Sequence, residues 1–144
     1  MPFPADTARD TEQPSGGQLD LVSIRVAPQQ GYDRVVFELA GTGQPGWTVG
    51  YVDATRADAS GDPVRVEGQA FLELGISNVD WTKPDFKKID APALPAGLGV
   101  VRDVVSSVTF EAQYQAFIGT SKKAPFRVTR LADPPRVVVD VRHG

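Results

Sequence analysis

The sequence predicts an all-β fold, an antiparallel β-sandwich or partly open barrel of about eight to nine short strands. Short runs in which apolar and polar residues alternate cover most of the chain. Turn residues separate these runs at intervals of roughly ten residues, and no segment has a convincing helical pattern.

One strand pattern occurs twice in the sequence. "DRVVFEL" begins at residue 33 and "PRVVVDV" begins at residue 135. Side chains alternate between the two faces of a strand, so each run has an apolar face and a charged face. The residues expected to face a shared core are Val35, Phe37, Leu39, Val137, Val139 and Val141.

The repeat extends upstream, where "LDLVSIRVAPQQGYD" precedes the first copy and "APFRVTRLADP" precedes the second. Each reads as a hairpin, which suggests two related halves packed on one core. If the two copies pair in antiparallel fashion, Arg34 lies near Asp140 and Arg136 lies near Glu38. The alternative is ordinary solvated sheet charge, in which an exposed pair contributes only about 0–1 kcal/mol.

The remaining strands are predicted from the same alternation. In residues 19–26 the alternation puts Val22, Ile24 and Val26 on one face. The other predicted strands are 47–53, 64–66, 69–76, 100–108 and 110–119. The shared face of the last run is Phe110, Ala112, Tyr114, Ala116 and Ile118. Residues 77–99 form a long irregular segment.

The chain has 144 residues with 41% apolar residues, enough for one domain with a core of its own. Residues 1–18 are polar and are expected to be a disordered linker ahead of a single domain at 19–144. The net charge of −3 and the absence of a basic cluster argue against nucleic acid. No apolar stretch approaches the length of about 20 residues that spans a bilayer, and no signal peptide is recognisable.

Catalytic signatures are scarce, and we interpret the chain as a non-enzyme without cofactor or metal. The chain has no cysteine and a single histidine, His143, which stands next to last and is expected to be flexible and dispensable. Asp53, Asp58 and Asp62 share one loop, but their spacing does not match a calcium-binding loop. We interpret these three carboxylates as solvated loop residues.

The ending "PFRVTRLADPPRVVVDVRHG" resembles the AMIN domain of cell-wall amidases and pilus secretins. "GYDRVVFELAG" followed by "GWTVGYVD" is similar to the AMIN-like domain of actinobacterial exported proteins and lipoproteins. The resemblance covers most of residues 19–142. It implies a non-catalytic, exported module of the cell envelope that binds peptidoglycan or related wall material, with a lipid anchor ahead of residue 1 as one option. The alternative function is a protein-interaction or structural module that contacts an envelope protein partner.

Peptidoglycan, the ligand class implied by the resemblance, offers sugar rings and peptide carboxylates. Aromatic faces suit the first and cations suit the second. Trp47, Tyr51 and Tyr114 alternate with apolar residues, which favours core packing. The candidate ligand-binding residues are Trp81 and Phe86 in the long segment, with Arg34, Arg136, Lys83, Lys87 and Lys88 as counter-charges. Packing of Trp81 and Phe86 onto the sandwich is the alternative for those two rings.

Overall fold

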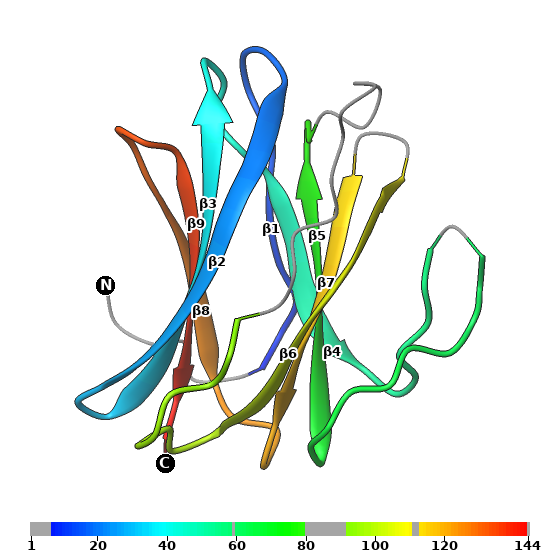
Figure 1. Cartoon of the computed structure of the whole chain (residues 1–144), viewed down its shortest axis with the longest axis vertical. Helices are drawn as coiled ribbons and strands as arrows, with labels where there is room; N and C mark the ends of the chain where they lie inside the picture. The colour runs from blue at the N-terminus through cyan, green and yellow to red at the C-terminus, as the bar shows by residue number, and fades with distance from the viewer. Residues whose placement is uncertain (1–6, 59, 80–91, 111–112, 144) are drawn as a thin grey trace.

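The computed structural model describes residues 7–58, 60–79, 92–110 and 113–143, with the side chains of 108–110 left out. Within these residues it has nine β-strands in two antiparallel sheets, packed face to face (Figure 1). The sequence-based prediction of a β-sandwich is therefore confirmed. The described residues contain no helix long and apolar enough to cross a membrane.

Most of the strands lie on predicted runs, and the exceptions are described below. They are β1 Asp10–Glu12, β2 Leu19–Gln29, β3 Tyr32–Gly41, β4 Trp47–Val52, β5 Ala70–Ser77, β6 Val101–Phe110, β7 Gln113–Thr120, β8 Phe126–Leu131 and β9 Arg136–Arg142.

The two similar hairpins build one sheet between them, with the strand order β2-β3-β9-β8. We call it the hairpin sheet. The repeated strands β3 and β9 pair side by side in antiparallel register, with Arg34 opposite Asp140 and Glu38 opposite Arg136. The register expected from the repeat is therefore confirmed.

The larger sheet has the order β1-β4-β5-β7-β6. Its edge strand β1 lies inside the segment that composition marks as a disordered linker, so that expectation is wrong for Asp10–Glu12. These polar residues pair with β4 through their backbones, and Trp47 Nε1 donates a 3.0 Å hydrogen bond to Asp10 Oδ1. Backbone pairing at an edge needs no apolar side chain, which is why composition gives no signal for it.

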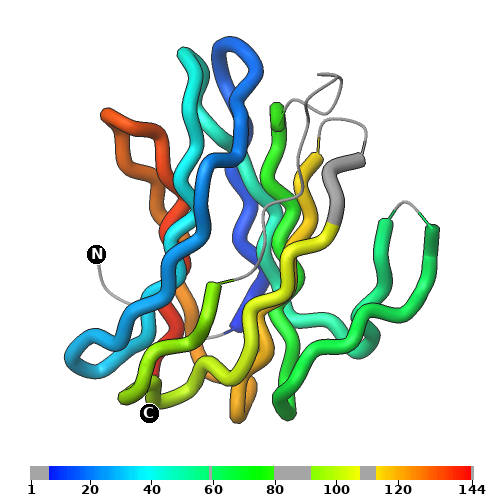
Figure 2. The backbone as a smooth tube through the Cα atoms, viewed as in Figure 1, coloured from blue at the N-terminus to red at the C-terminus, as the bar shows by residue number. Residues whose placement is uncertain are grey.

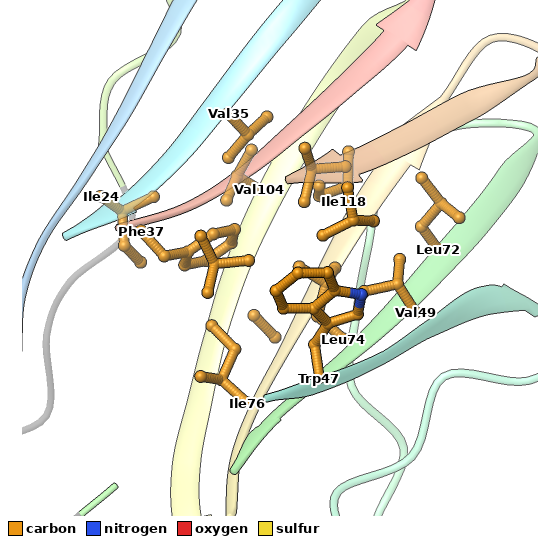
Figure 3. Packing of buried hydrophobic residues seen from close by; sticks show 14 of the residues in the cluster. Ile24, Val35, Phe37, Trp47, Val49, Leu72, Leu74, Ile76, Val104 and Ile118 are labelled. Carbon is orange, nitrogen blue, oxygen red and sulfur yellow. The ribbon is translucent and has the colours of Figure 1, made fainter. Parts of the chain in front are cut away.

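Side chains from both sheets meet in one core (Figure 3). All six residues expected there from the repeated strands are fully buried. Tyr114, Ala116 and Ile118 are also buried, and so is Trp47. Tyr51 packs against the same cluster and donates a hydrogen bond to the carbonyl of Ala124. The three aromatics interpreted as core residues thus pack as expected.

Strict alternation fails in β2. The pairing of β2 with β3 shifts between Leu21 and Ser23, which is a β-bulge, and Val22 is 45% exposed. The expectation that Val22 shares a face with Ile24 is therefore wrong. The extra residue in the bulge points outward, and this lets Leu21 stay opposite Leu39 of the core strand.

Two further strand predictions need correction. Residues 64–66 form no strand, because they belong to an excursion between β4 and β5. The predicted strand 110–119 is split, since Phe110 ends β6 and pairs with Gln113 at the start of β7. The intervening Glu111 and Ala112 lie outside the described residues. Neither is a typical turn residue, so the sequence carries no sign of the reversal.

The excursion, residues 53–58 and 60–69, forms an arm that stands out beside the larger sheet (Figure 2). The side chain of Gln115, on the outer face of β7, holds it. Gln115 Oε1 accepts a 2.9 Å bond from Asp58 N, and Gln115 Nε2 donates a 2.8 Å bond to the carbonyl of Arg56. Gly119 lies under the return of the arm, where any side chain would collide with the carbonyl of Glu67.

Candidate functional site

The outer face of the hairpin sheet collects cationic side chains, and we call it the arginine face. Strand alternation and register place five arginines on it against three carboxylates, although the whole chain has a net charge of −3. The arginines are Arg25, Arg34, Arg127, Arg136 and Arg142, and the carboxylates are Asp20, Glu38 and Asp140. This face is therefore net positive, although the chain as a whole is acidic.

A cross-strand row forms the middle of this face. Arg34 of β3 and Arg127 of β8 stand on either side of Asp140 of β9, each directly opposite it in register. Arg34 donates from Nε and Nη2 to the two oxygens of Asp140 at 2.8 and 3.1 Å, and Arg127 donates from Nε at 2.9 Å. Asp140 is 1% exposed, so this carboxylate is a buried bridge between two partly exposed guanidiniums.

The ring of Tyr32 completes the row. The guanidinium carbon of Arg127 lies 5.0 Å from the ring centroid and that of Arg34 lies 5.6 Å from it. These are cation–π distances. We call Tyr32, Arg34, Arg127 and Asp140 the Tyr32 centre. Hydrogen bonding to Asp140 raises the pKa of Arg34, which strengthens its positive charge in the folded protein.

The second predicted pair is not formed. Arg136 stands opposite Glu38, but its guanidinium donates to the carbonyls of Pro134 and Ala132 in the β8–β9 turn, each at 3.1 Å. Glu38 instead accepts a 2.8 Å bond from Arg25 on β2. Arg136, in the second copy, therefore binds carbonyls of a turn, whereas Arg34, in the first copy, belongs to an ion pair with a buried carboxylate.

The structure thus describes two of the seven candidate binding residues, and it separates them. Arg34 belongs to the Tyr32 centre and Arg136 lies at the opposite end of the strands. The other five candidates, Trp81, Lys83, Phe86, Lys87 and Lys88, lie outside the described residues.

Sequence reasoning missed Tyr32 and Arg127. The signal for Arg127 was present, because a hairpin with its turn near residues 132–135 puts Arg127 opposite Asp140. Tyr32 stands two positions before Arg34 on the same strand and therefore shares its face.

A second polar cluster, centred on Asp33, lies at the end of the sandwich where the chain terminus meets residues 92–100 (Figure 1). Asp33 is fully buried and accepts bonds from the backbone N–H groups of Gly99, Val100 and Val101 at 2.8–3.1 Å. His143 Nε2 lies 2.7 Å from Asp33 Oδ1. Burial alone would raise the pKa of Asp33, but the hydrogen bonds, led by those of Val101 and Val100, hold it below the usual value.

The Asp33 cluster corrects the expectation for His143. This residue is not a free terminal side chain, because its ring binds Asp33 and its backbone N–H donates to the carbonyl of Gly31 at 2.9 Å. The cluster ties the chain end and the approach to β6 onto β3. Its role in the structure is to hold segments together.

A shallow pocket of about 200 Å³ lies between the β3–β4 and β8–β9 turns. Its lining is Gly43, Gln44, Pro45, Arg130, Leu131, Ala132 and Pro135. Arg130 donates to the carbonyl of Pro45 at 3.1 Å and to that of Gln13 at 3.3 Å, so this guanidinium holds β8 against neighbouring segments. The pocket is smaller than the roughly 300–1,000 Å³ typical of small-molecule sites.

Among the described residues no group of three or more His, Asp or Glu side chains is arranged to hold a metal ion. The Tyr32 centre offers permanent cations and an aromatic ring, which suit the binding of an anion.

Comparison with protein families matches residues 19–143 to the family described as the AMIN-like domain. No curated protein matches the chain.

Proposed function

Because this chain belongs to the AMIN-like domain family, we propose that it binds peptidoglycan or related cell-wall material through its arginine face. The family consists of non-catalytic modules generally associated with the cell envelope, and its domains are typically extracytoplasmic. In this proposal the protein is exported and localises at the wall. It performs no chemistry there.

The observation that carries the proposal is the concentration of arginines on one sheet of an acidic protein. Arg25 and Arg142 are exposed, and Arg34 is partly exposed above the buried Asp140. A polymer that carries peptide carboxylates is attracted to such a face and repelled by the acidic remainder. Repeated weak contacts along a polymer add up, so no deep pocket is required.

The candidate contacts in this proposal still include Trp81, Phe86, Lys83, Lys87 and Lys88. Their residue types suit sugar rings and carboxylates, as argued from the sequence. Arg136 also remains a candidate, although its guanidinium is bonded to the β8–β9 turn.

Co-sedimentation with purified insoluble peptidoglycan tests the proposal. We expect the wild-type protein to be depleted from the supernatant, and depletion should weaken as salt rises. The double variant R25E/R142E reverses two exposed charges of the arginine face and should stay in solution. A matched control, R56E/R65E, makes the same charge change on the arm.

Two results would contradict the proposal. Failure of the wild type to sediment would remove wall binding and leave the protein-interaction module as the alternative. Equal loss of binding in R25E/R142E and in R56E/R65E would show that total charge matters and that the arginine face does not.

A further inference from the structure

We propose that the outer edge of β4 is a strand-binding groove. Residues 9–15 of this chain fill the groove as an internal ligand, and an extended acidic peptide of a protein partner binds there in their place. The partner strand carries two carboxylates one residue apart, as Asp10 and Glu12 do. The groove is separate from the arginine face, because it lies at the edge of the larger sheet (Figure 1).

The segment that fills the groove is attached to the domain without being part of its core. Within the described residues the core begins at Leu19, where the match to the family also begins. Five of the seven side chains in residues 9–15 are exposed. Gly16 and Gly17 join the segment to β2, and glycine is the most flexible residue. A strand of this kind opens at a lower free energy than the core strands do.

Two glycines shape the groove so that the backbone of a strand can lie close to it. A side chain at Gly46 would collide with the backbone nitrogen of Pro14 and with the carbonyl of Glu12. A side chain at Gly43 would collide with the carbonyl of Ser15. Neither glycine has a positive φ, so the close approach of the segment accounts for glycine at these positions.

The groove also recognises the two carboxylates of the segment. Asp10 Oδ1 accepts a 3.0 Å hydrogen bond from Trp47 Nε1, and Glu12 Oε1 lies 3.5 Å from Arg130 Nη2. The same guanidinium donates to the carbonyl of Gln13 at 3.3 Å and lies 5.9 Å from the Trp47 ring. Side chains two positions apart share one face of a strand. Two carboxylates one residue apart therefore match the indole and guanidinium donors.

A partner strand with this pattern can make the contacts that the segment of this chain makes. When a strand adds to a sheet edge, backbone pairing supplies affinity and alternate side chains supply specificity. The pairing of Asp10 with Val49 and of Glu12 with Trp47 sets the register. The chain's own segment competes at an effective concentration on the order of millimolar. Residues 9–15 thus restrict the groove to partners that bind it better or are held nearby.

Titration of a full-length variant with a synthetic peptide tests the proposal. D10K/E12K weakens the chain's own segment and leaves every groove residue in place. The probe is the acetylated and amidated peptide of residues 7–17, and binding is followed by NMR at the Trp47 Nε1–H signal. We expect a saturable shift of this signal in D10K/E12K. The wild type should bind the peptide at least about tenfold more weakly, because its own segment competes.

Two controls locate the groove and define its specificity. A peptide with lysine at both acidic positions should not bind. Adding Gly46→Ala to D10K/E12K should abolish binding of the acidic peptide, because the methyl group takes the place of the strand backbone. Adding Gly75→Ala instead is the matched control. It lies on β5 of the same sheet, where a methyl group would meet the movable side chain of Gln113, and it should leave binding unchanged.

Three results would overturn the proposal: no saturable shift of the Trp47 signal in D10K/E12K, equal binding of the lysine peptide, or unchanged binding after Gly46→Ala. If D10K/E12K does not fold, the wild type decides alone. Its Trp47 signal should shift with the acidic peptide at millimolar concentration and not with the lysine peptide, and the absence of that difference would equally overturn the groove.

Discussion

Arg34 and Asp140 stand directly opposite each other on neighbouring strands, although 106 residues separate them in the chain. Two hydrogen bonds of 2.8 and 3.1 Å join them, and the carboxylate is buried. The pair connects the two similar hairpins at the centre of the hairpin sheet. It also orients the guanidinium that the proposed function places against the cell wall.

Replacing Asp140 with Ala should destabilise the fold by roughly 2–4 kcal/mol. Breaking a buried pair is costly, but both guanidiniums here can turn toward water. Urea unfolding followed by circular dichroism measures the change. Glu38→Ala is the matched control, because its partner Arg25 is 52% exposed and such pairs contribute only about 0–1 kcal/mol. If Asp140→Ala loses no more free energy of unfolding than Glu38→Ala, the buried carboxylate stabilises the fold no more than an exposed pair does.

Stability should fall at acid pH through Asp33. Hydrogen bonds in the folded state hold its pKa below the usual value, so the fold favours the ionised form. The stabilisation is fully present above the pKa of the unfolded chain, about 4, and is lost as pH falls through the lower folded pKa. The free energy of unfolding between pH 2 and pH 6 measures this.

Asp33→Asn should remove most of this fall in the free energy of unfolding at acid pH. It should also lower stability at neutral pH. His143→Ala should also lower stability at neutral pH, by about 1 kcal/mol, because it deletes one bond to a buried carboxylate. If Asp33→Asn and the wild type show the same pH dependence, another carboxylate controls acid unfolding.

Gln115→Leu should release the arm. The change keeps the size of the side chain but deletes the bonds to Asp58 N and to the carbonyl of Arg56. Hydrogen exchange at Asp58 N should become faster, whereas exchange in β3 and β9 should stay unchanged. Gln13→Leu, at an exposed position, is the control. Unaltered exchange at Asp58 would mean that other contacts hold the arm.

Phe37→Ala should cost about 3–5 kcal/mol, because Phe37 is fully buried and packs against Tyr114. Val22→Ala should change stability by less than about 0.5 kcal/mol, since the bulge exposes Val22. Similar losses for both variants would contradict the register of β2 and β3 described above.

The core and the central register could be predicted because they depend on alternation. Phe37 and Val139 belong to half-buried strands in which apolar residues recur at every second position. The similarity of the two strands also suggests that Arg34 faces Asp140. Val22 could not be placed, since a bulge breaks the period without any marker residue. Asp10 gave no signal, because an edge strand needs only its backbone to pair.

The candidate site was predicted in part for a similar reason. Arg34 was identified from the pattern of its own strand. Tyr32 and Arg127 could be assigned to the site only once β3, β9 and β8 were known to lie side by side. Asp33 also escaped notice. Its partners, the backbone N–H groups of Gly99, Val100 and Val101, carry no side-chain chemistry that a sequence could reveal.

Arginine footprinting tests the central claim most directly. The protein is treated with phenylglyoxal with and without bound insoluble peptidoglycan, and modification at each arginine is read by mass spectrometry. We expect the wall to protect Arg25, Arg34 and Arg142, and to leave Arg65 on the arm as reactive as in free protein. Equal reactivity of all four with and without the wall, or protection of Arg65 alone, would contradict binding through the arginine face.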